Sequence, residues 1–317
     1  MNIVFMGTPD FAVASLDAIY HSSHHVVGVV TVPDRQTGRG LKLTCSPVKE
    51  YAIQHSLRLL QPEKLRNEEF LSELRSLHAD LFVVVAFRML PKEVWAMPHM
   101  GTFNLHASLL PQYRGAAPIN WAIINGETES GVTTFLLNEH IDEGCILMQE
   151  RTPITPTDNA ETLHDRLSSM GSRMVVQTID GLANRTLKGI PQKETSLLKP
   201  APKIFKNDCA IHWELTGNEI VNFVRGLSPY PAATMQMIDD NGKIQQFKIF
   251  KANAEKTDEI HAEVPVGNLL SDEKNYIKVR CQDGFVSILE LQINGKRRNS
   301  VSEFLRGYKI SNWKITR

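Results

Sequence analysis

Two polar side chains near the end of an apolar run are of the types that donate hydrogen bonds to a reacting oxygen. Asn104 and His106 lie at the end of a predicted strand over residues 102–105. Residues two apart on an extended chain project to the same side, so an amide and an imidazole can face one substrate atom. Parallel strands bind ligands at their carboxyl ends. The pair therefore indicates a candidate catalytic site beyond this strand.

A carboxylate further along the chain can complete this pair. Asp142 lies in the sequence Ile-Asp-Glu-Gly at residues 141–144, in a glycine-containing loop between two predicted strands. A carboxylate in that position can orient an imidazole for general acid–base catalysis. Each residue also has a purely structural interpretation, because a histidine after a strand is often hydrogen-bonded, and Asn104 or Asp142 can form a turn.

The sequence argues against several other kinds of site. The first turn, Gly-Thr-Pro-Asp at residues 7–10, lacks the G-x-G-x-x-G pattern, and no Walker lysine motif occurs, so we expect neither a dinucleotide nor a nucleoside-triphosphate site. The four cysteines form no C-x-x-C pair, which argues against a structural zinc site and a disulfide framework. The histidines of residues 21–25 have no acidic or thiol partner nearby in sequence, so we interpret them as a surface turn and expect no bound metal.

The elements that position these residues alternate between strands and helices over the first part of the chain. Such alternation indicates a doubly wound, mostly parallel, Rossmann-like sheet of the α/β class. We assign residues 1–189 to this catalytic domain. The predicted strands are 2–6, 25–32, 81–86, 102–105, 132–137 and 146–150, and the predicted helices are 11–19, 49–55, 68–77 and 161–183.

Prolines change the character of the chain after the long helix. Pro191, Pro200 and Pro202 disfavour regular structure, so we assign residues 190–207 to an extended linker. Residues 208–317 combine one predicted helix, at 218–227, with short strands separated by turn signals. This spacing predicts a small C-terminal β-barrel, resembling the oligonucleotide-binding (OB) type. The predicted strands are 233–238, 246–251, 276–281 and 286–291.

The charge of the chain is balanced as a whole but not between its parts. The 35 basic and 35 acidic side chains cancel, which alone speaks against a protein that binds a polyanion. Divided at Gly189, the chain carries a net charge of −4 in front and +4 behind. This asymmetry indicates a basic face on the second part, although chance variation in surface charge would produce it equally well.

The composition and the first residues indicate an ordinary soluble protein. Hydrophobic residues make up 42% and charged residues 22% of the chain, as in globular proteins. The sequence starts without a basic, cleavable leader, and the apolar run at 81–87 is too short to span a membrane. We therefore expect a cytoplasmic protein that makes no membrane contact.

Several motifs together resemble a known family. They are Gly-Thr-Pro-Asp-Phe-Ala at residues 7–12, the loop at 33–40 with Ser-Pro-Val-Lys at 46–49, and the stretch from Asn104 to Gly115 followed by Ala-Ala-Pro-Ile. In this order they closely resemble the methionyl-tRNA formyltransferases, which are folate-dependent enzymes, and the resemblance runs over nearly the whole chain. Two departures fall on the expected folate pocket: residues 86–91 are one residue shorter than the common version, and Cys145 replaces a frequent aspartate.

The resemblance implies a set of site residues and substrates. Asn104, His106 and Asp142 would form the active site, and the segment Ser108, Leu109, Leu110 and Pro111 would lie against the folate. The formyl donor would be 10-formyltetrahydrofolate and the acceptor initiator methionyl-tRNA, with no metal and no obligate protein partner. A neutral amine would attack the formyl carbon while Asn104 and protonated His106 donate hydrogen bonds to the formyl oxygen.

Basic residues in both parts of the chain are expected to contact the tRNA. A glycine-rich loop can remodel around an acceptor stem, and lysines and arginines behind Gly189 carry the positive excess. The expected residues are Arg39 and Lys42 in the loop, and Lys203, Lys206, Lys296, Arg297 and Arg298 behind it.

Other functions remain open on the sequence alone. A formyltransferase with a small acceptor, such as glycinamide ribonucleotide or an amino sugar nucleotide, would use the same Asn, His and Asp. A non-catalytic RNA-binding protein would not need that set, and a folate hydrolase would release formate without an amine acceptor.

Overall fold

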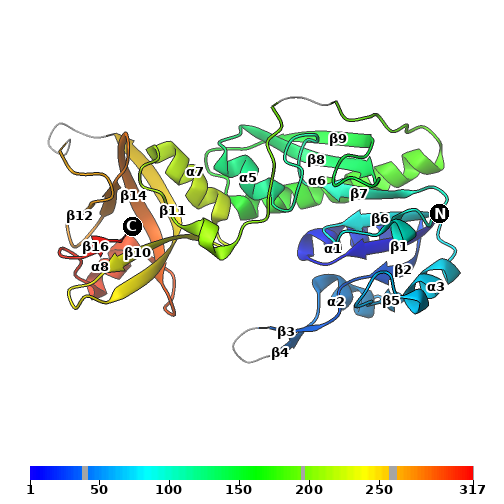
Figure 1. The fold of residues 1–317 in the computed structure, drawn as a ribbon, viewed down its shortest axis with the longest axis horizontal. Coiled ribbons are helices and arrows are strands. Elements are labelled where there is room, and N and C mark those ends of the chain that lie inside the picture. Colours follow the sequence, from blue (N-terminus) through cyan, green and yellow to red (C-terminus); the bar gives the residue numbers. More distant parts are fainter. Residues whose placement is uncertain (38–41, 194–196, 257–262, 317) are drawn as a thin grey trace. The chain divides into compact units, whose positions relative to one another are not determined.

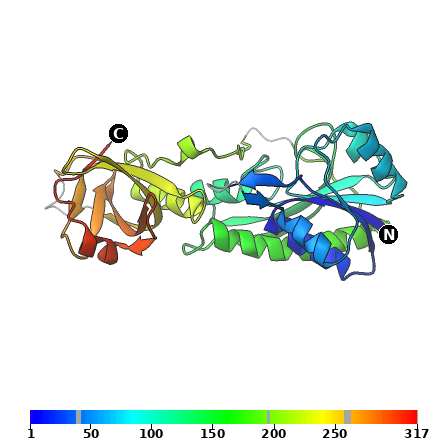
Figure 2. The same cartoon turned by 90° about the horizontal axis from the view of Figure 1, so that it is seen from below.

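The computed structural model describes residues 1–37, 42–193, 197–256 and 263–316. The chain forms two compact units (Figures 1 and 2), each described here by itself. The first unit contains residues 1–118, 130–152 and 164–201, and the second contains residues 119–129, 153–163 and 202–317.

The first unit is built on one sheet with the strand order β5-β2-β1-β6-β7-β8-β9. The pairs from β5 to β7 are parallel, whereas β8 runs antiparallel to β7. The chain winds outward from β1 in both directions, so the carboxyl ends of β1 and β6 mark the switch point of a doubly wound sheet. The predicted fold class is thus confirmed. The strands are β1 (Asn2–Gly7), β2 (His25–Val30), β5 (Leu59–Leu60), β6 (Leu81–Val85), β7 (Thr102–His106), β8 (Glu129–Leu136) and β9 (Ile146–Pro153).

Helices cover both faces of this sheet. Val4 and Met6 of β1 share a buried core with Phe70 of α3, while Leu105 of β7 lies against Gly171 of α6 on the opposite face. Full burial of each such side chain contributes roughly 1.5–3 kcal/mol, which explains why the strands are almost wholly apolar. The helices of this unit are α1 (Asp10–Tyr20), α2 (Pro47–Gln54), α3 (Glu68–Ser76), α4 (Lys92–Trp95) and α6 (Ala160–Ala183).

Local signals in the sequence set where these helices begin. The Ser46 side chain accepts a hydrogen bond from the Lys49 amide, and Pro47 occupies the first helical turn, so α2 begins two residues before the predicted start. Asn67 caps α3 in the same manner through the Phe70 amide. A short hairpin, β3 (Arg35–Thr37) and β4 (Lys42–Thr44), precedes α2 and was not predicted.

The second unit is a strongly coiled antiparallel sheet around one apolar core, which agrees with the predicted small barrel. Its strand order is β12-β13-β14-β11-β10-β16, and β15 also pairs with β14. Phe247, Ile249 and Leu291 are fully or nearly fully buried at its centre. The strands are β10 (Ala233–Ile238), β11 (Ile244–Lys256), β12 (Leu269–Ser271), β13 (Ile277–Arg280), β14 (Gly284–Ile293), β15 (Asn299–Ser300) and β16 (Lys314–Ile315); the helices are α5 (Pro118–Ile124), α7 (Gly217–Leu227) and α8 (Val301–Gly307), with the 3₁₀ helix η1 (Lys206–Cys209).

The segment predicted as an extended linker is less free than its prolines suggest. Residue Ile190 bridges to Ile146 of β9, and Ala201 bridges to Gly115, both within the first unit. Near its other end η1 begins at Lys206. The prediction of no regular structure was therefore wrong for this end, because Asp208 accepts a hydrogen bond from the Phe205 amide and closes the turn. The division into catalytic domain (1–189), linker (190–207) and C-terminal domain (208–317) stays a proposal about function.

Among the described residues, no helix has both the length and the apolarity needed to cross a bilayer.

Candidate active site

Asn104 and His106 lie on one face of β7, as their spacing predicts. Asn104 is paired in register with Val84 of β6 and with Phe135 of β8, so it lies inside the sheet near the carboxyl end of β7. Its side chain is half-buried, and among the described residues its amide makes no hydrogen bond. The amide is therefore available to a ligand at the edge of the sheet.

His106 is buried and held in a defined orientation. It is 6% exposed, its ring meets the Phe135 ring edge-on, and its Nε2 lies 2.8 Å from the backbone carbonyl oxygen of Tyr113. Because a carbonyl oxygen only accepts, Nε2 must carry a hydrogen. In the neutral ring Nδ1 is then the unprotonated nitrogen. Nδ1 lies 3.9 Å from Oδ2 of Asp142.

The structure thus brings the three predicted catalytic residues together. The contact that orients the His106 ring is nevertheless the Tyr113 carbonyl, which the sequence did not reveal. The 3.9 Å separation of His106 and Asp142 exceeds a direct hydrogen bond. Asp142 therefore faces the imidazole as a neighbouring carboxylate without a direct hydrogen bond.

Asp142 is fixed by the backbone around it. Its φ is +56°, a left-handed conformation that aspartate tolerates better than most residues. Oδ2 of Asp142 accepts a 2.9 Å hydrogen bond from the Gly115 amide. Gly144 follows in the same loop, where an added Cβ would lie 1.5 Å from the carbonyl oxygen of Leu136. Only glycine fits there, so the loop runs tightly over the end of β8.

The predicted folate segment is partly buried, and several of its backbone groups are hydrogen-bonded within the protein. Ser108 and Leu110 are buried, whereas Leu109 and Pro111 are partly exposed. The Ser108 hydroxyl donates to the Gln112 carbonyl at 2.7 Å, which closes the turn that leads to Tyr113. The segment therefore supports the histidine, and it can meet a ligand through two of its four side chains.

The shortened segment after β6 is anchored by its own arginine. Arg88 donates through Nη1 and Nη2 to the carbonyls of Glu63 and Pro62, at 3.0 and 2.8 Å. Burial lowers the pKa of this guanidinium. The next residue, Met89, is 72% exposed, and Ile141 beside Asp142 is 58% exposed. One large apolar side chain after β6 and one beside the candidate carboxylate are thus exposed.

The predicted tRNA-binding residues fall into two groups. Arg39 lies outside the described residues, and Lys42 is in β4 but its side chain is not described. Lys49, in the same region, donates to Asp34 at 2.6 Å and is thus already paired. In the second unit, Lys203 and Lys206 are exposed, and the Lys203 ammonium lies over the exposed Phe205 ring.

The basic turn after β14 is exposed, but its three charges are not equivalent. Arg298 donates from Nε to Glu290 at 2.7 Å and stacks over the Phe250 ring. Lys296 and Arg297 have no ion pair among the described residues. Two of the three charges in this turn are therefore free to meet a phosphate.

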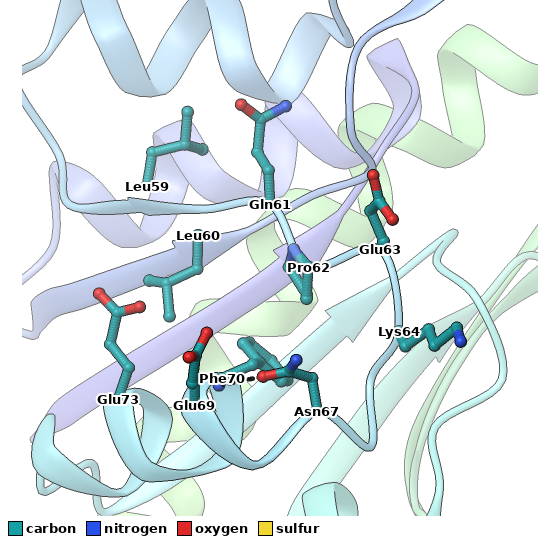
Figure 3. Close-up of a pocket in the computed structure, with 10 residues that line it drawn as sticks. All are labelled: Leu59, Leu60, Gln61, Pro62, Glu63, Lys64, Asn67, Glu69, Phe70 and Glu73. Atoms are coloured by element: carbon teal, nitrogen blue, oxygen red, sulfur yellow. Dashed lines mark hydrogen bonds between the residues drawn. The ribbon is translucent and has the colours of Figure 1, made fainter.

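An open pocket of about 570 Å³ in the first unit contains none of the predicted catalytic, folate-binding or tRNA-binding residues (Figure 3). It is lined by residues 59–73 of β5, the following loop and α3. Two of its polar side chains are engaged, since Asn67 caps α3 and Glu73 pairs with Arg58. Size alone does not make it the reactive site, because none of the three residues predicted to be catalytic lines it.

Within the described part of the chain, no group of three or more histidine, cysteine, aspartate or glutamate side chains could hold a metal ion. The histidine-rich turn at residues 21–25 is not wholly at the surface, contrary to the prediction. His24 is 8% exposed, and its Nε2 lies 2.9 Å from Asp180 of α6. This pairing anchors the turn to α6.

Comparison with known proteins identifies the family. The formyl transferase family model matches residues 1–179, and the model of the formyl transferase C-terminal domain matches residues 203–309. A methionyl-tRNA formyltransferase of Bacteroides thetaiotaomicron is 52% identical over 314 residues, which cover 98% of this chain and 97% of that protein. One from Parabacteroides distasonis is 54% identical over 314 residues, covering 98% and 96%.

Solved structures show the same fold. An N-formyltransferase from Helicobacter canadensis, solved with folinic acid and dTDP-3-aminofucose, matches with a TM-score of 0.61 and 22% identity over 94% of this chain and 99% of that one. HypX from Aquifex aeolicus, solved with tetrahydrofolic acid, matches with a TM-score of 0.60 and 18% identity; 99% of this chain covers 50% of HypX. Identities this low support the fold alone. Since relatives more than half identical span nearly the whole chain, it belongs to the methionyl-tRNA formyltransferase family.

Proposed function

We propose that this protein transfers the formyl group of 10-formyltetrahydrofolate to the amino group of methionine on initiator methionyl-tRNA, and that it does so in the cytoplasm as part of translation initiation. The observation that carries the proposal is the grouping of Asn104, His106 and Asp142 at the carboxyl end of β7 in a chain of this family. The folate segment Ser108–Pro111 and the exposed Met89 and Ile141 lie on loops next to this set in the sequence.

The chemistry needs a donor for the formyl oxygen and a base for the amine. The amine lone pair attacks the formyl carbon and the C=O electrons move onto oxygen, where the Asn104 amide donates a hydrogen bond. Nδ1 of His106, left unprotonated by the Tyr113 contact, takes the amine proton and passes it to the departing folate nitrogen. Asp142 stabilises the imidazolium between these two events. The C–N bond to folate breaks and the amide bond to methionine forms.

Binding of the tRNA is proposed to use both units. Arg39 and Lys42 would meet the acceptor end, and the exposed basic side chains of the second unit would meet phosphates. Phosphate contacts of this kind position the nucleic acid without reading its sequence. The second-unit residues are Lys203, Lys206, Lys296, Arg297 and Arg298.

The experiment that tests this function offers 10-formyltetrahydrofolate together with one acceptor at a time. The acceptors are initiator methionyl-tRNA, glycinamide ribonucleotide and an amino sugar nucleotide, and the formylated product is identified by mass. We expect formylation of methionyl-tRNA at a kcat/KM at least a hundredfold above that of either small acceptor. The His106→Ala variant serves as the chemical background. Preferential formylation of a small acceptor, or release of formate without any acceptor, would contradict the proposal.

A further inference from the structure

The carboxylate of the candidate site is held by a network that starts far away in the sequence. Gln192 lies in the segment after α6, and its Nε2 donates to the carbonyl oxygens of Asp142 at 2.8 Å and Gly144 at 2.9 Å. Both hydrogens of the amide are used by the loop that carries the carboxylate. Its assignment is unambiguous, because carbonyl oxygens only accept.

The oxygen of the same amide is held by an arginine. Oε1 of Gln192 accepts from Nε of Arg114 at 3.2 Å and from Nη2 at 2.7 Å, so the guanidinium grips it with two donors. Nη1 of Arg114 donates to Glu143, the residue after Asp142, at 2.9 Å. The guanidinium and the amide thus form one planar connection to three consecutive residues of the loop.

Asp142 is held both at its backbone and at its side chain. Gln192 binds the backbone carbonyl of Asp142, while the amide of Gly115, which follows Arg114, binds the Asp142 carboxylate at 2.9 Å. Tyr113, which precedes Arg114, provides the carbonyl that orients His106. A three-residue segment therefore sets the geometry of both the imidazole and the carboxylate, and Gln192 holds that segment against the loop.

We propose that Gln192 and Arg114 are positioning residues that fix Asp142 relative to His106 during formyl transfer. This inference rests on the proposed function, and it concerns residues to which the sequence assigned no role beyond a place in a motif. The left-handed backbone of Asp142 needs such support, because a non-glycine residue holds that conformation only where its surroundings determine it.

Substitutions of Gln192 can separate the role of its donor nitrogen from that of its acceptor oxygen. Gln192→Leu removes both the donors and the acceptor. Gln192→Glu keeps an acceptor for Arg114 but turns an oxygen toward two carbonyl oxygens, so the loop loses its support while the arginine stays bound. Arg114→Lys keeps a positive charge near Glu143 and loses the two-donor grip. Gln245→Leu is the matched control, because it removes an amide hydrogen bond to Asp239 in the second unit.

We expect Gln192→Leu and Gln192→Glu each to lower kcat ten- to a hundredfold, with KM for both substrates within about threefold, since small misplacement of a catalytic group costs that much. Arg114→Lys should lower kcat by a smaller factor, and Gln245→Leu should leave it unchanged. Melting temperatures report whether a variant is folded. A residue that merely stabilises the fold would lower the melting temperature without this split between kcat and KM.

A double-mutant cycle provides the decisive readout. If Gln192 acts through the Asp142 carboxylate, Gln192→Leu in the Asp142→Asn background should lower kcat by less than threefold further. Full multiplication of the two effects, or a kcat within threefold of wild type in both Gln192 variants, would overturn the inference. Failure of the wild-type protein to formylate methionyl-tRNA would instead refute the proposed function, and the two failures are therefore distinct.

Discussion

The basic turn after β14 gives a prediction whose size follows from the structure. If the turn binds tRNA phosphates, each cation that meets a phosphate releases counterions, and this makes the binding constant fall with salt. Arg298 is paired with Glu290 and packed on Phe250, so binding there releases few ions. Lys296 and Arg297 are exposed, and the described structure gives them no ion pair.

Two free charges therefore determine the expected change. At about 0.7 to 0.9 units of log–log slope per contact, Lys296→Gln with Arg297→Gln should flatten the salt dependence of tRNA binding by about 1.4 to 1.8 units. Adding Arg298→Gln should change the slope by less than about 0.5 further, since its charge is already balanced. Treating all three charges as free would predict a loss of about 2.1 to 2.7 units for the triple variant.

The assay is fluorescence anisotropy of labelled initiator tRNA from about 50 to 200 mM salt, a range over which the Debye length falls about twofold. Lys243→Gln with Lys274→Gln provides the charge-matched control, because both lysines are exposed on other turns of the second unit. Unchanged slope in the Lys296 and Arg297 double variant would refute the reasoning and make the turn ordinary solvated surface. An equal change in the control would refute it as well, because the effect would then be one of net charge.

Three further predictions concern the first unit. His106→Ala should lower kcat by about two to four decades. Asp142→Asn should lower kcat by the same factor with little loss of stability, because asparagine keeps an acceptor for the Gly115 amide. Near-normal turnover in either variant would contradict the assigned roles. Asn104→Ala should cost about two to three decades as one oxyanion donor, measured as kcat under saturating substrates, and a larger loss in KM than in kcat would contradict this. The hydrogen bond from Lys49 is the main cause that holds the pKa of Asp34 below its ordinary value. The ionised carboxylate therefore stabilises the folded protein fully above that ordinary pKa. This contribution is lost as the pH falls through the lower pKa of the folded state. Asp34→Asn should therefore be less stable near neutral pH but lose less stability between about pH 5 and 2; melting curves that stay parallel over that range would exclude the linkage.

The elements with strong periodic signals could be predicted from the sequence. Buried strands such as β6 and the long helix α6 appear as continuous or periodic apolar patterns, and the structure confirms them. The short elements were missed because their signals are local. The helix α8 begins at a capping box in which Ser300 and Glu303 bind each other's amides, a pattern that is visible in the sequence but easily overlooked.

The candidate site shows a different limit of prediction. Asn104 and His106 could be placed together because the two-residue period of a strand fixes their side. The contact of His106 with the Tyr113 carbonyl could not be predicted from the sequence, since every residue has a carbonyl and only the fold brings this one to the ring. Gln192 lies 50 residues from Asp142 in the chain, and nothing in its neighbourhood indicates the loop it supports.

The Tyr113 contact also decides the order of events in the proposed reaction. A hydrogen on Nε2 leaves Nδ1 of neutral His106 as an acceptor, so at the moment of attack this nitrogen can take a proton but cannot donate to the formyl oxygen. Of the two residues, only Asn104 then provides a donor for the first negative charge. Once Nδ1 has taken the amine proton, the same atom becomes a donor, and its new charge faces Asp142 at 3.9 Å.

The roles of the two residues are therefore sequential. In the proposed reaction Asn104 would stabilise the intermediate as it forms, and His106 with Asp142 would stabilise it as it collapses and would protonate the departing folate nitrogen. On this order, losing Asn104 should slow formation of the intermediate, whereas losing Asp142 should slow its breakdown. A folate analogue whose leaving nitrogen is less basic needs less help from a proton donor, so it should restore a larger share of the activity of Asp142→Asn than of Asn104→Ala. Equal recovery in the two variants would contradict the assignment of the two residues to different steps.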